Sequence, residues 1–255
     1  MPRILKAYCI GHTQPIFDPP INYQMLCPHP LGIPGEIVID DNRFGPMIDG
    51  TSLAEYSQLF GLYELLSTGD IVADDLFLFQ YRKFLSPNSG GAASTASWVK
   101  VVGAEEGIKL FPTLEQLESL SSRVLVGSLL DLTESISMNY ARVHVIDDLI
   151  MFSAACARNK YLSAADIKSF ATFRGLIPSP ALCFIKTELF IEIMKILKET
   201  WDEYYHEYNI KREGYQRRVA GYLLERLHSH LLCKWLLDGS EPEIPVWERY
   251  VVLNK

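Results

Sequence analysis

The chain has 255 residues, a formal net charge of −7 and a hydrophobic fraction of 48%. A chain of this length and apolar content can bury a complete core, and a single α/β domain over residues 1–255 is the ordinary outcome. The acidic balance, with a pI near 5.4, argues against nucleic acid as a partner, because neutralising phosphate groups requires a basic surface.

The cysteines indicate a reducing compartment. They are odd in number, scattered and never in a Cys-x-x-Cys spacing, which is typical of reduced and mostly buried thiols. They are Cys9, Cys27, Cys156, Cys183 and Cys233. The first residues become polar too early for a signal peptide, and no stretch reaches the roughly 18 apolar residues that a membrane helix needs. The sequence therefore predicts a cytoplasmic protein.

The first 40 residues predict two short strands separated by an irregular segment. Residues 4–10 alternate in the manner of a strand and run into Gly11, His12 and Thr13. Residues 14–35 are rich in proline and are expected to lack regular structure. Residues 36–39 form a short strand candidate, and Asp40 and Asp41 follow it in a turn.

The centre of the predicted fold is residues 76–79, an unbroken apolar run typical of a strand buried on both faces of an α/β sheet. A helix is expected before this strand, over residues 52–67, because apolar residues recur there at helical spacing. Ser52 and Glu55 have the spacing of a capping box at its start. Gly69 is expected to end the helix.

Polar residues follow the buried strand directly: Gln80, Tyr81, Arg82 and Lys83. Ligands of open α/β sheets bind at the carboxyl ends of the strands. Two cations and an aromatic ring at such an end favour a flat, anionic ligand, such as a sugar nucleotide. The alternative is a strand that leaves the core for a basic surface loop. Residues 86–97 are small and polar and predict a mobile loop, which is either a lid over this site or a loop without a role.

The rest of the chain predicts an α/β fold with a helix-rich C-terminal third. Further strands are expected over residues 98–102, 124–126, 181–185 and 245–253. Helices are expected over residues 138–157, 163–170, 187–208 and 213–237. Ser163 has the position of an N-cap residue for the second of these helices.

The last predicted helix has an arginine on its apolar side. At 100° per residue, Val219, Leu223 and Leu227 lie on one broad apolar face, with Arg226 near its middle. A buried arginine needs a carboxylate or a phosphate as a partner. The alternatives for Arg226 are therefore an anionic ligand and an internal Arg–Glu network that ties the helix to the sheet.

A second stripe on the same helix combines Arg218, Gly221 and Glu225 at spacings of three and four residues. A glycine inside a helix costs about 1 kcal/mol relative to alanine. Its use is therefore expected to be the close approach of a ligand or of another backbone. The same Arg–Glu network is the alternative for Arg218.

Five colinear segments carry a resemblance to a known family. ADDLFLFQYRKFL at residues 73–85 resembles its central motif, a strand that runs into His-Tyr-Arg-Arg-Tyr-Phe. YCIGHTQP at 8–15, PALCFIKT at 180–187 and RVAGYLLERL at 218–227 resemble further signature segments, and Tyr140, His144, Asp148 and Leu149 resemble a Tyr…His…Asp-Leu pattern. The family is the bacterial capsular polysaccharide and O-antigen glycosyltransferase-like proteins, long catalogued as a domain of unknown function.

The sequence departs from the family pattern at several positions. Gln80 stands where the family has histidine, Lys83 where it has a second arginine, and Phe77 and Ala181 where it has glycine and asparagine. The resemblance retains four charged residues: Arg82, Arg218, Glu225 and Arg226. If the family histidine carries chemistry, Gln80 implies different chemistry or a different acceptor.

The resemblance implies a GT-A-like, Rossmann-like mixed sheet flanked by helices, and glycosyl transfer from a nucleotide sugar to a glycan, a lipid-linked acceptor or another hydroxyl. Preorganised cations would stabilise the leaving diphosphate. The expected donor-binding residues are His12, Thr13, Gln80, Tyr81, Arg82, Lys83, Arg218 and Arg226. The acceptor pathway also implies peripheral contact with a membrane glycan-assembly complex.

An inverting transferase also needs a base for the acceptor hydroxyl. The candidates are His144, Asp148 and Glu225, of which His144 alone has an ordinary pKa near neutrality. A purely structural histidine is the alternative. No Asp-x-Asp follows Phe79, so metal-independent transfer is expected. Asp40 and Asp41 offer a Mg²⁺ or Mn²⁺ site, with a solvated turn as the favoured alternative.

Two other functions are weighed against transfer. The first is a non-catalytic relative that binds a sugar nucleotide or glycan, or that acts as a scaffold in glycan assembly. Gln80 and Lys83, the departures from the family motif, favour it. The second is an unrelated α/β phosphoester hydrolase, which no nucleophile elbow, phosphate-binding loop or paired metal motif supports.

Overall fold

The structure is a computed structural model that describes residues 3–40, 53–208, 212–237 and 247–253. Within these ranges ten strands form one mixed sheet in the order β3-β2-β1-β4-β5-β12-β7-β6, with β11 beside β4 and β8 beside β11. The strands of this sheet are β1 (Leu5–Ile10), β2 (Gln24–Cys27), β3 (Ile37–Val38), β4 (Asp75–Gln80), β5 (Lys83–Ser86), β6 (Ala92–Ala93), β7 (Lys100–Val102), β8 (Val124–Val126), β11 (Cys183–Lys186) and β12 (Glu248–Val252).

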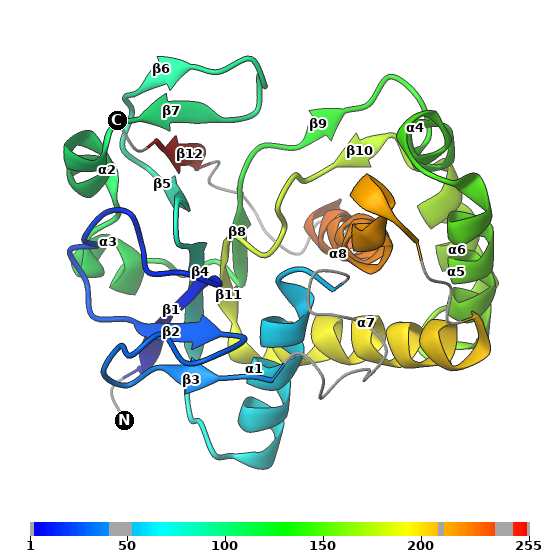
Figure 1. Cartoon of the computed structure of the whole chain (residues 1–255), viewed down its shortest axis with the longest axis horizontal. Coiled ribbons are helices and arrows are strands. Elements are labelled where there is room, and N and C mark those ends of the chain that lie inside the picture. Colours follow the sequence, from blue (N-terminus) through cyan, green and yellow to red (C-terminus); the bar gives the residue numbers. More distant parts are fainter. Residues whose placement is uncertain (1–2, 41–52, 209–211, 238–246, 254–255) are drawn as a thin grey trace.

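A small antiparallel pair, β9 (Leu130–Asp131) and β10 (Gly175–Leu176), lies apart from the main sheet. The helices are α1 (Tyr56–Thr68), α2 (Ala104–Leu110), α3 (Leu114–Glu118), α4 (Ile136–Val143), α5 (Ile146–Arg158), α6 (Ala164–Thr172), α7 (Thr187–Tyr208) and α8 (Val219–Leu237), with a 3-10 helix at Gly214–Arg218 before α8. Figure 1 shows α2 and α3 on one side of the sheet and α1, α7 and α8 on the other.

The two faces of the sheet bury two separate cores. In β4, Leu76 and Leu78 point to the core on the α1, α7 and α8 side, whereas Phe77 and Phe79 point to the core that contains Phe111. Side chains of a strand alternate between faces, so an unbroken apolar run is needed where both faces are covered. The structure therefore confirms the expectation that residues 76–79 form a strand buried on both faces.

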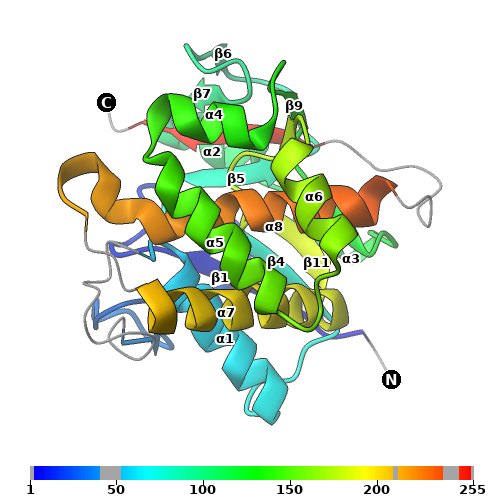
Figure 2. The ribbon, with the colours of Figure 1, turned by 90° about the vertical axis from the view of Figure 1, so that its right-hand side faces the viewer.

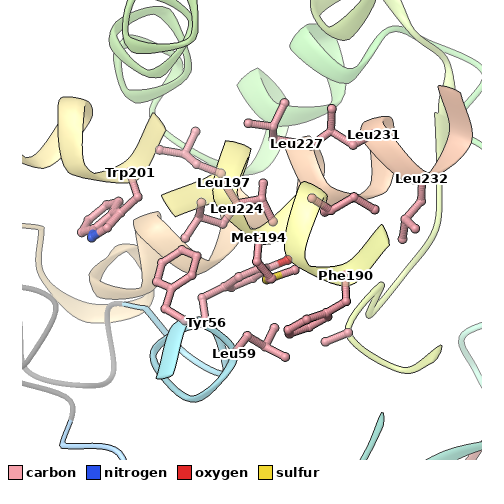
Figure 3. Close-up of a cluster of buried hydrophobic side chains, with 14 of the residues drawn as sticks. Tyr56, Leu59, Phe190, Met194, Leu197, Trp201, Leu224, Leu227, Leu231 and Leu232 are labelled. Carbon is pink, nitrogen blue, oxygen red and sulfur yellow. The ribbon is translucent and has the colours of Figure 1, made fainter. Parts of the chain in front are cut away.

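Helices α1, α7 and α8 pack directly on one another (Figure 3). Their contact is filled by large apolar side chains, all nearly inaccessible to solvent: Tyr56, Leu59, Phe190, Met194, Leu197, Trp201, Leu224, Leu227, Leu231 and Leu232. Figure 2 shows α4, α5 and α6 as an outer layer over α7 and α8. This packing fixes α8 beside the sheet, which matters because α8 carries residues of the candidate site.

Most predicted elements are present, and two expectations about secondary structure were wrong. Residues 14–35 contain β2, because Gln24–Cys27 has no proline and pairs in parallel with β1. Residues 138–157 form α4 and α5 rather than one helix: α4 ends at Val143, with His144 extended after it. Asp147 and Asp148 lie in the first turn of α5, where acidic side chains favour a helix start. Residues 86–97 are largely irregular and contain only the two-residue strand β6, paired with β7; their mobility and a role as a lid stay predictions.

The start of α1 also differs from the expected one. The helix begins at Tyr56, and Glu55 occupies the N-cap position without a side-chain hydrogen bond. Ser52, the predicted cap, lies outside the described residues. Gly69 ends the helix with a φ of 81°, a left-handed conformation that glycine adopts without strain.

Candidate functional site

The carboxyl ends of β1 and β4 bring the first site residues together. The two strands are parallel neighbours, with Ile10 opposite Gln80, so their following loops leave the same edge of the sheet. The rings of His12 and Tyr81 lie edge to face with centroids 5.2 Å apart. A Cβ at Gly11 would lie 3.1 Å from the Tyr81 ring, so glycine allows this close approach.

A tight turn between β4 and β5 presents the basic residues. Gln80 pairs with Lys83, which leaves Tyr81 and Arg82 at the tip of the turn. The tip is held on both sides: the Tyr81 carbonyl accepts a hydrogen bond from Ile16 N at 3.0 Å, and the Arg82 carbonyl accepts one from Val252 N at 2.8 Å. The basic segment is therefore anchored in the sheet rather than extended into a free surface loop.

Helix α8 and the turn before it supply the opposite wall. Arg218, Gly221, Tyr222 and Glu225 face the turn between β4 and β5 across one cavity of about 700 Å³. The predicted stripe of Arg218, Gly221 and Glu225 thus lines a cavity, and at Gly221 the missing side chain leaves the helix backbone next to it. Glu225 is fixed by the Ser179 N–H, which donates to Oε1 at 2.9 Å.

The cavity gathers seven of the predicted site residues: His12, Gln80, Tyr81, Arg82, Lys83, Arg218 and Glu225. It also includes residues that the sequence did not single out as site residues, among them Glu55, Trp98, His29 and Ser179. Glu55 has the spacing of a capping-box residue, so its sequence context pointed to a structural role. Trp98 directly follows the small, polar segment 86–97. Its place next to a candidate lid was the one feature of the sequence that could have pointed to the site.

Charges of both signs meet in the cavity. Arg82, Lys83 and Arg218 line it together with the carboxylates of Glu55 and Glu225. Burial raises the pKa of the Glu55 carboxyl group above its usual value, and the nearby Glu225 carboxylate raises it further. Burial lowers the pKa of Lys83, while Glu55 and Glu225 act in the opposite direction. The site is therefore a mixed electrostatic environment in which a bound anion would meet cations already in place.

Four of the predicted site residues are not among the described residues that line the cavity. Asp148 is fully buried and pairs with Arg212 at 2.8 Å. His144 donates a hydrogen bond from Nδ1 to Gln216 Oε1 at 3.1 Å, and its ring stacks on Tyr222 with centroids 4.3 Å apart. Thr13 is half-buried in the loop after β1.

Arg226 is the fourth of these residues. It is buried, as its place on the apolar face predicted, but its hydrogen-bond partners are neutral oxygens. Its Nη1 donates to the Tyr222 carbonyl at 3.1 Å and its Nη2 to Asn139 Oδ1 at 3.2 Å. The guanidinium also lies 4.9 Å from the centre of the Tyr140 ring. The functional roles of Thr13, His144, Asp148 and Arg226 stay predictions.

The described residues give no candidate metal centre. In residues 3–40, 53–208, 212–237 and 247–253, no group of three or more His, Cys, Asp or Glu side chains is arranged to hold a metal ion. Asp40 is exposed after β3, and Asp41 lies outside the described residues, so a Mg²⁺ or Mn²⁺ site at this pair stays a prediction. All five cysteines are free and buried, as expected. Among the described helices none has the length and apolar character to span a bilayer.

Comparison with known proteins identifies the fold. No family model matches the sequence, and no curated protein sequence matches it. Among solved structures, the bifunctional glycosyltransferase WbbM in its apo form is similar, with a TM-score of 0.76 at 18% identity over 99% of this chain. The chain spans 46% of the length of that neighbour. The GT-A-like, mixed α/β fold that the sequence resemblance implied is therefore confirmed.

Proposed function

We propose that the chain is a glycosyltransferase that moves a sugar from a nucleotide-sugar donor to a hydroxyl group of a glycan or lipid-linked acceptor. The observation that carries the proposal is the convergence of Arg82, Lys83 and Arg218 on one cavity at the carboxyl ends of β1 and β4. Ligands of open α/β sheets bind at this edge. The fold shared with a bifunctional glycosyltransferase supports the same class of reaction.

The donor diphosphate is assigned to the three cations. As the bond between the sugar and the diphosphate breaks, negative charge develops on the leaving phosphate oxygens. Cations that are already in position stabilise this charge without reorganisation. Arg82 and Lys83 are held by the turn between β4 and β5, and Arg218 by the 3-10 helix that leads into α8. The nucleoside is assigned to the aromatic pair His12 and Tyr81, beside the arginines.

The base is assigned to Glu225, because it is the one of the three predicted bases that lines the described cavity. In a single displacement, the acceptor hydroxyl oxygen forms a bond to the anomeric carbon. The bond from that carbon to the diphosphate breaks, and its electron pair leaves with the diphosphate. The hydroxyl proton passes to the Glu225 carboxylate, which its hydrogen bond from the Ser179 N–H holds in place.

A non-catalytic donor- or glycan-binding protein is the second candidate function. Gln80 lines the cavity at the position where the resembling family has histidine. An amide neither donates nor accepts a proton at neutral pH, so any acid–base step at that position is lost. This function predicts saturable nucleotide binding without turnover of any donor sugar.

The test is a thermal-shift screen of nucleoside diphosphates and nucleotide sugars, with and without Mn²⁺. A ligand at 100 times its dissociation constant stabilises a fold by about 2.7 kcal/mol. We expect a saturable shift with one nucleotide, and its loss in Arg82→Ala and Arg218→Ala. Arg158→Ala, which removes an arginine of α5 that pairs with Glu203, is the control. The absence of any shift at millimolar nucleotide would contradict the proposal.

Turnover separates the two candidate functions. The nucleotide sugar that gives the largest shift is incubated with the protein and a panel of hydroxyl acceptors, and release of the nucleoside diphosphate is measured. Release that depends on acceptor and protein concentration supports transfer. Binding without release across the panel supports the non-catalytic function.

A further inference from the structure

Arg249 is a buried arginine whose hydrogen-bonding groups are only partly used. It lies on β12 with 3% of its surface exposed. Its Nη1 donates to the Trp98 carbonyl at 3.1 Å, and its guanidinium lies 5.3 Å from the centre of the Trp98 ring. Among the described residues, no acceptor meets its Nε and Nη2. Burial lowers the pKa of Arg249 to about 10, so the group stays charged at neutral pH.

Two buried carboxylates among the described residues have ion-pair partners, whereas buried Arg226 has hydrogen bonds to neutral oxygens only. Asp148 pairs with Arg212, and Asp75 pairs with both Arg3 and Lys186. The Glu225 carboxylate partly offsets the effect of burial on Arg249, but no acceptor among the described residues meets its Nε and Nη2. Leaving these groups unmet is unfavourable, and an anionic ligand would supply the missing partner. The free N–H groups of Arg249 therefore point to an anion that is not part of the protein.

The strand register places Arg249 on the cavity side of the sheet. In the antiparallel pair of β5 and β12, Lys83 lies opposite Val251 and Leu85 lies opposite Arg249. Residues two apart on a strand share a face, so Lys83 and Arg249 point to the same face of the sheet. Lys83 and Trp98 line the cavity, and Trp98 contacts the Arg249 guanidinium. Arg249 itself is not among the lining residues and lies buried behind Trp98.

Gly127 packs against the flat face of this guanidinium, and the Nε and Nη2 atoms at its edge are buried without an acceptor among the described residues. A Cβ at Gly127 would lie 2.4 Å from Nη2, 2.7 Å from Cζ and 3.2 Å from Nε of Arg249. These distances place it above the plane of the group rather than at its edge. The guanidinium is therefore stacked flat on the glycine, and its Nε and Nη2 hydrogens point along the plane, away from Gly127.

We propose that Arg249 is a fourth cation of the cavity, and that its free N–H groups bind a phosphate oxygen of the donor diphosphate together with Lys83. The inference rests on the proposed function. Charge supports it, because the four cations Arg82, Lys83, Arg218 and Arg249 exceed the two carboxylates Glu55 and Glu225 by two. A diphosphate diester, the linkage of a nucleotide sugar, carries two negative charges. Guanidinium groups suit phosphate because they donate two parallel hydrogen bonds.

The test compares Arg249→Met with the wild-type chain, using inorganic pyrophosphate and the nucleoside diphosphate panel as probes. Loss of a charge-assisted hydrogen bond weakens binding about tenfold to a hundredfold, and we expect this loss for both probes. We also expect the melting temperature of the empty variant to stay level or rise, because methionine removes a buried charge whose Nε and Nη2 have no acceptor among the described residues. Arg158→Met is the control for the loss of a surface arginine.

Gly127→Ala is the second variant, since it keeps the charge and displaces the guanidinium. It is expected to weaken pyrophosphate binding as well. If Arg249→Met does not fold, the pyrophosphate affinity of Gly127→Ala decides whether Arg249 binds the anion. A lower melting temperature in Arg249→Met with unchanged pyrophosphate affinity in both variants would overturn the inference, because Arg249 would then be a structural residue.

The outcomes also separate this inference from the proposed function. If Arg82→Ala loses nucleotide binding and Arg249→Met retains it, the inference fails and the proposed function stands. If the wild-type chain binds pyrophosphate but no nucleotide, the proposed function fails, and the two Arg249-directed variants still decide the anion site. If the wild-type chain binds neither probe at millimolar concentration, both are overturned.

Discussion

Asp148 and Arg212 form a buried, two-pronged ion pair between the first turn of α5 and the segment before α8. Arg212 Nη2 lies 2.8 Å from Asp148 Oδ1, and its Nε lies 3.2 Å from Oδ2. The Asp148 side chain is fully buried, and that of Arg212 is 27% exposed. Both oxygens of Asp148 are thus engaged by one guanidinium, an arrangement that holds α5 and the segment before α8 together.

Asp148→Asn is therefore expected to lower the free energy of unfolding by about 3 kcal/mol, the lower end for a broken buried pair, because Arg212 is partly exposed. Urea unfolding measures the difference. Asp147→Asn is the matched control: it removes an exposed acid from the same helical turn, where the effect is about 0.3–1 kcal/mol. A catalytic Asp148 would instead show full stability with loss of turnover.

Glu225→Gln is expected to remove the base and keep the binding site. The glutamine carbonyl can still accept the hydrogen bond from the Ser179 N–H, so the local structure should hold. Proton transfer by a positioned base contributes about 10²- to 10⁴-fold to a rate. We expect kcat to fall within that range while the dissociation constant for the nucleotide changes little.

The control for this change is Glu192→Gln, which alters an exposed acid of α7. A Glu225→Gln protein with undiminished kcat would show that another group accepts the proton. His144 would then become the next candidate, and its substitution would be tested in the same assay.

Glu55 is expected to weaken the fold at neutral pH. Burial and the Glu225 carboxylate raise the pKa of Glu55, so the native state favours the protonated form. Below the pKa of the unfolded chain, about 4.3, Glu55 is protonated in both states and does not weaken the fold. As the pH rises through the higher pKa of the folded chain, the free energy of unfolding falls, because ionising Glu55 is less favourable in the folded state. Glu55→Gln should therefore be more stable than the wild-type chain at pH 7, with the difference vanishing near pH 4.

Urea unfolding of both proteins between pH 4 and pH 8 measures this effect, with Glu192→Gln as the exposed control. A difference in stability that does not change with pH would show that Glu55 titrates normally in the folded chain. The same variant would then report only the change in packing at the start of α1.

Local sequence patterns predicted most of the elements that position the cavity residues. The buried run of β4 and the basic residues after it could be read directly, because a strand covered on both faces must be continuously apolar. The helical spacing of Arg218 and Glu225 likewise predicted one shared face, and both line the cavity. In these cases the periodicity of a single element fixes which side chains lie together.

The parts that the sequence did not predict depend on contacts between distant segments. Arg249 gave no local signal, because its burial comes from Trp98 and Gly127, which lie far from it in the chain. Glu55 fits a capping box by spacing, so its place in the cavity emerges only when α1 packs against α8. His144 and Asp148 were expected on one helix, and the break between α4 and α5 separates their environments.

The last prediction separates recognition of the nucleoside from recognition of the diphosphate. His12 and Tyr81 form the aromatic pair at the edge of the cavity, whereas the cations lie on Arg82, Lys83 and Arg218. Stacking of a base on an aromatic ring contributes about 1–3 kcal/mol. His12→Ala should therefore weaken nucleoside diphosphate binding about fivefold to a hundredfold and leave inorganic pyrophosphate binding unchanged, because pyrophosphate has no ring to stack. Isothermal titration with both ligands measures the two affinities in one variant. An equal loss for both ligands would place His12 at the diphosphate instead, and no loss for either would assign the nucleoside to another wall of the cavity.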